Sequence, residues 1–322
     1  MAAFPSITRE EARVVGRAFR EEVDVLVAIW ARAEARLREL ATDPELVALA
    51  QGGPENITAA RQRQAVLMVQ TRQAIEEMRA ASAAWAREAI ASQALAGSNA
   101  AVASAVEQGL TAVGVLGVAN VPTIESLLED ILIDVDQAVD SANRTMRRHF
   151  RLTQQRLITE AEINLSLAIS ESRLENLDQR SKRLQRQFAK ATAGGAFVEV
   201  AGRRFRLETY AELVGRTRLA EAASGAAFAT TQDMGIDLVR VSDHGPTDPI
   251  CNAFAGKVFS ASGRDSRFPV LRQKPPFHPN CLHVLLPYVA ELKTDDELRF
   301  AIARSRDEVG VGVSIGEFLA AA

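Results

Sequence analysis

The sequence predicts an α+β protein in which a long, mostly helical N-terminal region precedes a small α+β module and a short C-terminal helix. Two observations support this prediction. Between Thr123 and Ala193 there is neither glycine nor proline, the residues that most often interrupt helices. By contrast, residues 240–288 hold both cysteines, three of the four histidines and most of the prolines. Such a change in composition marks a separate small domain.

The composition is that of a globular protein built largely from helices. The chain has 322 residues, enough for two domains, with 47% hydrophobic and 25% charged residues. Aromatic residues make up only 5%, which suits helices packed through Ala, Leu and Val. The net charge of −3 does not indicate a nucleic-acid partner for the whole chain. Two cysteines do not make a disulfide framework, so we expect a reducing cytoplasm as the compartment.

No membrane segment is predicted. The N-terminal residues carry charges of both signs and no continuous apolar run, unlike a secretory signal. The most apolar window, residues 100–121, contains Glu107, Gln108 and three glycines, so it would be a poor membrane span.

The first helix is predicted to follow the capping box Thr8–Glu11, whose hydroxyl and carboxylate satisfy free backbone N–H groups. Apolar residues recur at steps of three and four from Val15 to Leu40, which places them on one helical face. The glycines and proline of residues 51–54 end this helix.

A second helix is predicted from about Thr58, with a narrow apolar seam that includes Met68 and Trp85. It fades into the small-residue stretch 96–120, whose glycines disfavour a helix. The next segment, residues 123–193, reads as a long helix or helical hairpin, and we expect a break near residues 148–153 because one uninterrupted helix would be unusually long. We also expect the seam and the long helix to expose an apolar stripe that promotes association.

The C-terminal part shows shorter elements. Alternating residues around an Ala-Gly turn predict a β-hairpin over residues 197–207. A capping box at Thr209–Glu212 predicts a helix running to about Asp233. Apolar runs at residues 237–242 and 284–289 predict strands, and a last capping box at Thr294 opens the C-terminal helix. The predicted organisation is a helical N-terminal region (1–122), a long helix or hairpin (123–193), the α+β module (197–290) and a C-terminal helix and tail (291–322).

Four residues of the module are of the types that bind zinc: Cys251, His278, Cys281 and His283. Structural zinc is usually four-coordinate, with cysteine and histidine ligands. The sequence therefore predicts a zinc site here, although the spacing is not that of a standard zinc motif. Two alternatives stay open, namely a proline-rich loop whose buried thiols act as small hydrophobes, and a Cys251–Cys281 disulfide in an extracellular form.

Cys251 also raises the question of an enzyme. It follows Asp-Pro and could begin a helix, which would lower the pKa of its thiol. A thiol hydrolase would need such a nucleophile together with an imidazole. No nucleophile signature surrounds Cys251, so we expect a non-enzymatic protein and no catalytic residue.

A basic patch spans the junction between the helical region and the module. Such a cluster can bind phosphates or an acidic protein surface. The basic residues are explained equally well as the solvated C-terminal end of a helix, where positive charges interact favourably with the helix dipole. Its eight members are Arg180, Lys182, Arg183, Arg186, Lys190, Arg203, Arg204 and Arg206.

A series of short segments in the module appears in a recognisable order. They are Phe197–Leu207, Tyr210–Thr217, Asp237–Ser242, Asp243–His244, Asp248 to Cys251, Gly256–Phe259 and Pro275–Cys281. In this order they resemble the module of phage minor capsid, or head morphogenesis, proteins related to the F protein of phage Mu. The helical first two thirds of the chain resembles such proteins only in style.

This resemblance implies a structural virion protein that is made in the bacterial host cytoplasm. It implies docking at the portal beside other head proteins, in multiple copies in a ring, and help in head assembly and in DNA packaging or ejection. It implies no membrane partner. Two alternatives stay open: a thiol hydrolase or toxin-type enzyme centred on Cys251, and a packaging factor that binds the packaged DNA through the basic patch.

Overall fold

The computed structural model describes most of the chain, and the packing divides it into two compact units. One unit combines residues 1–24, 85–131 and 213–322, and the other combines residues 25–84 and 132–212. We call the second the helical unit. The described residues are 9–51, 54–111, 121–165, 179, 182–183, 186, 197–200, 203–243, 248–278, 281 and 283–308.

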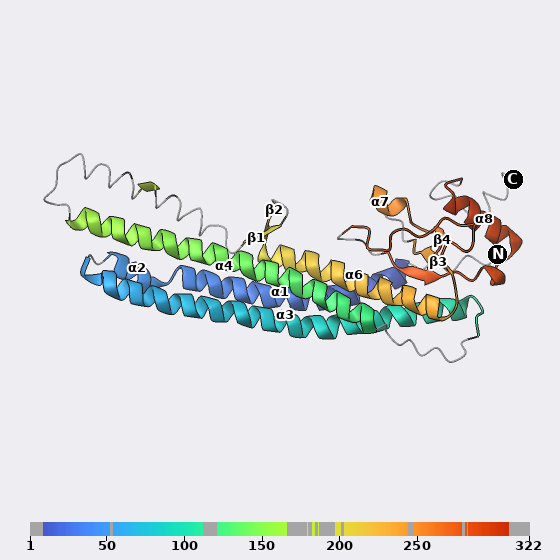
Figure 1. The fold of residues 1–322 in the computed structure, drawn as a ribbon, viewed down its shortest axis with the longest axis horizontal. Helices are drawn as coiled ribbons and strands as arrows, with labels where there is room; N and C mark the ends of the chain where they lie inside the picture. The colour runs from blue at the N-terminus through green and yellow to red at the C-terminus, as the bar shows by residue number, and fades with distance from the viewer. Residues whose placement is uncertain are drawn as a thin grey trace. The chain divides into compact units, whose positions relative to one another are not determined.

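Helices dominate the fold (Figure 1). No helix in the described part of the chain is long and apolar enough to cross a membrane. The predicted domain boundaries stay a prediction, because the two units follow packing and not chain order. The helical elements before the sheet are α1 (Arg9–Ala41), α2 (Pro44–Gln51), η1 (Pro54–Asn56), α3 (Ile57–Glu107), α4 (Val121–Leu165) and α6 (Leu207–Asp233).

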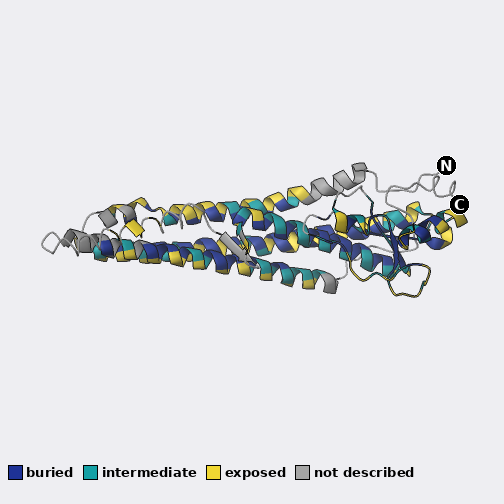
Figure 2. Ribbon diagram, turned by 90° about the horizontal axis from the view of Figure 1, so that it is seen from above, coloured by how far each residue is buried: buried dark blue, intermediate teal, exposed yellow. Residues whose placement is uncertain are grey.

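The core of the helical unit consists of large side chains that face inward from the long helices. Leu26 and Trp30 of α1 and Ile75 of α3 are completely buried, and buried and exposed residues alternate along the helices in Figure 2. The indole Nε1 of Trp30 donates a hydrogen bond of 2.9 Å to Ser82 Oγ. This bond satisfies the polar atom of a fully buried aromatic side chain.

The predicted apolar seam of α3 faces inward. Ile75, Met78 and Trp85 are buried, and Met68 is half-buried. The indole Nε1 of Trp85 donates to the Glu22 carbonyl at 2.9 Å. The expectation that this seam is exposed is therefore wrong, because the chain itself covers these residues. Association with other copies or with partners stays a prediction.

The break predicted near residues 148–153 is also wrong, since α4 is continuous to Leu165. Phe150 and His149 are buried, and His149 Nε2 lies 2.7 Å from the Ala41 carbonyl oxygen. Gln64 Nε2 donates to the Phe150 carbonyl at 2.8 Å. These tertiary contacts hold the helix through the segment, and most of the predicted continuation after residue 165 lies outside the described residues.

The first helix ends earlier than predicted. α1 stops at Ala41, and α2 begins at Pro44 with Asp43 before it. The Leu46 N–H donates to Asp43 Oδ1 at 2.8 Å, which is the capping bond of an aspartate with proline at the first helical position. The second boundary, at Gln51, agrees with the predicted break.

α3 does not fade at its glycines but continues past Gly97 to Glu107. At Gly97 the helix approaches α6 so closely that a Cβ atom would lie 2.0 Å from the carbonyl oxygen of Ala223. Glycine is therefore required here for packing, and its low helix propensity is offset by the close contact.

The hairpin is confirmed, with β1 (Phe197–Val200) antiparallel to β2 (Arg203–Arg206). α6 begins directly at Leu207, so the predicted capping box at Thr209 lies inside the helix and does not start it. The predicted C-terminal capping box is present, because Thr294 and Glu297 exchange both of its hydrogen bonds.

The module contains a three-stranded antiparallel sheet in the order β4-β3-β5. β3 (Leu238–Val241) and β5 (Leu285–Pro287) were predicted, whereas β4 (Val258–Ser260) was not. At the end of β5, Gln108, which directly follows α3, accepts a hydrogen bond from Val289 N–H at 3.1 Å and donates one to the Pro287 carbonyl at 2.8 Å. The remaining elements are α7 (Pro249–Asn252), η3 (Ala290–Leu292) and α8 (Asp295–Ser305).

The sheet separates two small cores, because successive side chains of a strand point to opposite faces. Val239 and Val241 belong to one buried cluster, together with Cys251 and Cys281. Leu238 belongs to another, together with Val258, Phe268, Tyr288 and Ala301. One face of the sheet therefore carries the thiols, and the other carries α8.

Candidate metal centre

Three of the four predicted zinc ligands come together on one face of the sheet. One ligand atom each from Cys251, His278 and Cys281 lies within 4.8 Å of the others. The two sulfurs are 3.8 Å apart, and tetrahedral bonds of about 2.3 Å from zinc to sulfur would place them about 3.8 Å apart. Cys251 Sγ and His278 Nε2 are 2.9 Å apart. If both bound one zinc ion, the distance between these two atoms would have to increase by roughly half an ångström.

Local backbone geometry positions each ligand. Asp248 caps α7, and its Oδ1 accepts hydrogen bonds from the N–H groups of Ile250 and Cys251 at 2.8 and 3.4 Å. With Pro249 at the first helical position, this cap fixes the turn that directs Cys251 into the core. The Cys281 N–H donates to the His278 carbonyl at 2.9 Å, a tight turn that brings these two ligands together.

His283, the fourth predicted ligand, lies beside this group but is not part of it. Its side chain is buried, and its Nδ1 is 3.5 Å from Cys281 Sγ. The centroid of its ring lies 5.9 Å from the ring centroid of Phe277. The separation from Cys281 is close to that of a sulfur and a nitrogen sharing one zinc, about 3.5 Å. His283 as the fourth ligand stays a prediction.

The electrostatics of Cys251 do not support the thiol hydrolase alternative. Burial and the neighbouring Cys281 thiol raise the pKa of Cys251 to about 12, whereas that alternative requires a helix start that lowers it. The helix is only four residues long, and loss of hydration outweighs it. The thiol is therefore a poor nucleophile, and a divalent cation would reverse this balance by stabilising the thiolates.

Both cysteines are free in this structure, with their sulfurs 3.8 Å apart. The candidate site provides two soft sulfur ligands and one imidazole ligand, enclosed by apolar side chains. This donor set suits zinc or another thiophilic metal. One sequence signal indicates how Cys251 is positioned. The Asp-Pro pair before it is typical of a helix cap followed by the first residue of the helix.

The basic patch is described only in part. Lys182, Arg183 and Arg186 are exposed, as are Arg203 and Arg206. Arg206 Nη2 lies 4.0 Å from the buried Glu34 carboxylate. The other members lie outside the described residues or have side chains that are not described: Arg180, Lys190 and Arg204. A phosphate-binding role for this patch stays a prediction.

Comparison with known protein families gives one match. The model of the family described as phage minor capsid protein 2 matches residues 17–305, which include the long helices, the sheet and the candidate metal ligands. Neither the curated proteins nor the solved structures gave a match. The resemblance to phage minor capsid proteins is confirmed, while the narrower relation to the F protein of phage Mu stays a prediction.

Proposed function

Since the chain belongs to the phage minor capsid protein 2 family, we propose that it docks at the portal and assists head assembly and DNA packaging or ejection. The family gives the protein a structural role in the capsid and makes it a component of the virion. Synthesis in the host cytoplasm and assembly as multiple copies in a ring are parts of the proposal. The observation that carries it is a family match covering both the helices and the module.

The proposal includes a zinc ion held by Cys251, His278 and Cys281, with His283 as the fourth ligand. Support comes from the sulfur–sulfur distance of 3.8 Å and from the burial of both thiols. The strands beside the site are only three or four residues long, so the module has little sheet to stabilise it. Zinc would tie α7 to the turn before β5 and contribute folding free energy.

The role is proposed as structural and not catalytic. Cys251 is 2% exposed and its pKa is raised to about 12, whereas a thiol nucleophile must be accessible and ionised. We expect iodoacetamide at neutral pH to leave Cys251 unmodified in the folded protein. Rapid stoichiometric labelling, with loss of infectivity but normal particle assembly, would revive the thiol hydrolase or toxin-type alternative.

The portal proposal is tested by locating the chain in assembled particles. Cross-linking of purified particles, followed by mass spectrometry, should give links between this chain and the portal protein, and electron microscopy should place it at the portal vertex. A phage lacking the protein should yield heads with defects in assembly or DNA content. Even distribution of the chain over the whole shell would contradict the portal role.

A role in binding packaged DNA is the second candidate. It is favoured by the exposure of Lys182, Arg183, Arg186, Arg203 and Arg206, since neutralisation of phosphates by such side chains drives non-specific binding. Titration of the purified protein with duplex DNA at increasing salt separates the candidates. Affinity that falls steeply with salt, and that is weakened by Arg183→Gln, would support DNA binding over pure protein docking.

A further inference from the structure

The helix α4 carries a row of exposed arginines in its C-terminal half. Their spacing of three, four and seven residues places them on one face of the helix, within an arc of about 100° and along about 10 Å of its axis. None of them belongs to the basic patch of residues 180–206. They are Arg144, Arg147, Arg148 and Arg151, and we call them the arginine stripe.

The opposite face of α4 is packed into the helical unit. Met146 and Phe150 are buried, and Gln64 of α3 donates a hydrogen bond of 2.8 Å to the Phe150 carbonyl. His149 Nε2 lies 2.7 Å from the carbonyl oxygen of Ala41 in α1. Because two other helices hold this face, α4 is fixed against rotation about its axis, and the arginine stripe is presented to solvent in a fixed direction.

Within the described chain, no acidic side chain forms an ion pair with the arginine stripe. Residues 141–159 contain no aspartate and no glutamate. The nearest acid on this face of α4 is Asp140, which precedes Arg144 by one turn. On α1, which contacts this part of α4, Glu39 is already paired with Arg36 at 3.0 Å. The stripe therefore keeps a local excess of positive charge at the surface.

The position of the stripe in the helix does not explain this charge. Cations are favoured by the helix dipole only in the last turn, and α4 continues for several turns after Arg151 to Leu165. Like charges three and four residues apart destabilise a helix, so the stripe weakens α4 in the free protein. A bound polyanion would remove this repulsion.

The surroundings of the stripe indicate which polyanion fits. Every exposed residue between Ser141 and Leu152 is one of its arginines, so the surface lacks the apolar centre that protein interfaces have. Phe150 is buried and offers no surface on which an unpaired base could stack. Over about 10 Å, a DNA duplex presents roughly six phosphates, and guanidinium groups bind phosphate through paired hydrogen bonds.

We propose that the arginine stripe of α4 binds the phosphate backbone of duplex DNA without reading its sequence. The proposal rests on the DNA-binding candidate of the proposed function and assigns that binding to a site outside the basic patch. Each guanidinium engages a phosphate and releases condensed counterions, which supplies the free energy of such binding. It is independent of docking at the portal.

The test measures binding of the full-length protein to a labelled duplex of arbitrary sequence by fluorescence anisotropy at several salt concentrations. Four neutralised phosphates predict a slope of about −3.6 for log K against log salt, so affinity should fall roughly a hundredfold between about 50 and 200 mM salt. The double variant Arg144→Gln with Arg148→Gln should reduce the size of the slope by about two. At about 50 mM salt it should bind at least about tenfold more weakly.

Two further double variants serve as controls. Arg264→Gln with Arg299→Gln removes the same charge from exposed positions of the sheet module and should leave affinity and slope unchanged. Arg144→Lys with Arg148→Lys keeps the charge of the stripe, so the slope should persist while affinity falls, because lysine cannot form paired hydrogen bonds. Equal binding by the stripe glutamine variant and the module control would overturn the proposal, and so would loss of the slope in the lysine variant.

Thermal melting followed by circular dichroism checks folding. The stripe glutamine variant should melt at or above the wild-type temperature, since repulsion is removed, and duplex DNA should raise the melting temperature of the wild type alone. Poly-L-glutamate of matched charge represents an acidic protein surface and should bind at least about tenfold more weakly than the duplex, because paired hydrogen bonds to closely spaced phosphates are lost. Equal or tighter binding of poly-L-glutamate would overturn the proposal in favour of a protein partner.

The basic patch is tested in parallel with Arg183→Gln combined with Arg186→Gln. If only this variant weakens binding, the DNA-binding candidate stands and the proposal for the arginine stripe is overturned. If the wild type does not bind the duplex even at low salt, both are overturned. Loss of binding in the stripe variant with normal binding in the patch variant is the expected result.

Discussion

The helical unit and the sheet module of residues 238–305 are stabilised in different ways. In the helical unit, long helices bury large apolar side chains such as Leu26, Trp30 and Ile75. Among the described residues of the module, the strands have three or four residues, and the two clusters contain seven and six buried residues. Caps, ion pairs and thiols fix the loops between these short elements.

The two regions differ in how the free energy of folding is distributed over their residues. Burial in the helical unit is spread over many residues, so the loss of one contact weakens the unit without removing its core. The module depends on a few specific groups, because its small clusters cannot offset the entropy of ordering long loops. We therefore expect changes in the module to act locally and changes in the helical unit to act on the whole unit.

The largest effect is expected from removing the proposed metal. Zinc in small structural sites contributes an apparent free energy of about 10–16 kcal/mol, more than any single side chain discussed here. Chelation, or Cys281→Ser, should speed amide hydrogen exchange across residues 248–288 and leave the helices of the helical unit protected. Elemental analysis should find close to one zinc per chain. Protein that lacks zinc and melts like the Cys281→Ser variant would show that the thiols serve only as packing.

The next effect concerns the centre of the helical unit. Trp30→Ala should lower the free energy of unfolding by about 3–5 kcal/mol, because it leaves a large cavity and deprives Ser82 of its donor. Trp30→Phe is the matched control and should cost less, since it keeps most of the ring. Urea unfolding followed by circular dichroism measures both. A loss below that of Trp30→Phe would contradict a core centred on Trp30.

A smaller effect is expected at the close approach of α3 and α6. Gly97→Ala should destabilise the protein by about 1–3 kcal/mol through overpacking, because the added Cβ would lie 2.0 Å from the Ala223 carbonyl oxygen. In an open helix the same change would stabilise by about 1 kcal/mol. The neighbouring exposed Asn99 provides the control, and Asn99→Ala should be neutral or stabilising. A higher melting temperature for Gly97→Ala would rule out this contact.

The smallest effect is a dependence on pH in the helical unit. Burial lowers the pKa of His149 below its ordinary value of 6.5, so below pH 6.5 the unfolded chain binds more protons than the folded one. Stability should therefore fall as pH drops from 7 towards the folded pKa, by up to about 1.4 kcal/mol per pH unit. Comparing the free energy of unfolding of the wild type and His149→Gln isolates this contribution. Equal pH dependence in both proteins would contradict it.

The sequence by itself determined the elements that depend on local patterns. The absence of glycine and proline after Thr123 predicted the long helix α4, and alternation around an Ala-Gly turn predicted the β1–β2 hairpin. The capping box at Thr294 predicted the start of α8 correctly. In each case the hydrogen bonds or side-chain periodicity involve residues close in the chain, so a linear pattern contains the necessary information.

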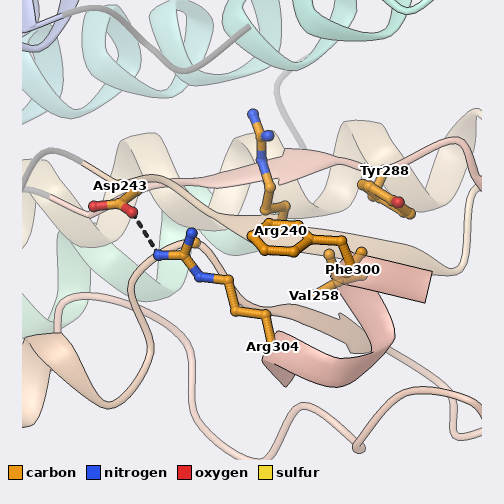
Figure 3. A pocket seen from close by; sticks show the side chains of 8 residues that line it. Arg240, Asp243, Val258, Tyr288, Phe300 and Arg304 are labelled. Atoms are coloured by element: carbon orange, nitrogen blue, oxygen red, sulfur yellow. Dashed lines mark hydrogen bonds and ion pairs between the residues drawn. The ribbon is translucent and has the colours of Figure 1, made fainter. Parts of the chain in front are cut away.

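Other features were decided only by the tertiary structure, because they depend on contacts between residues far apart in the chain. Gly97 looked like a helix breaker, but its contact with Ala223 keeps α3 continuous. Composition suggested four metal ligands, and packing brought three into one group with His283 beside it. The ion pair between Arg304 and Asp243 (Figure 3) required α8 to pack beside the segment that follows β3. No local sequence pattern predicts these tertiary contacts, because the free energy that stabilises them comes from burying surfaces that meet only after folding.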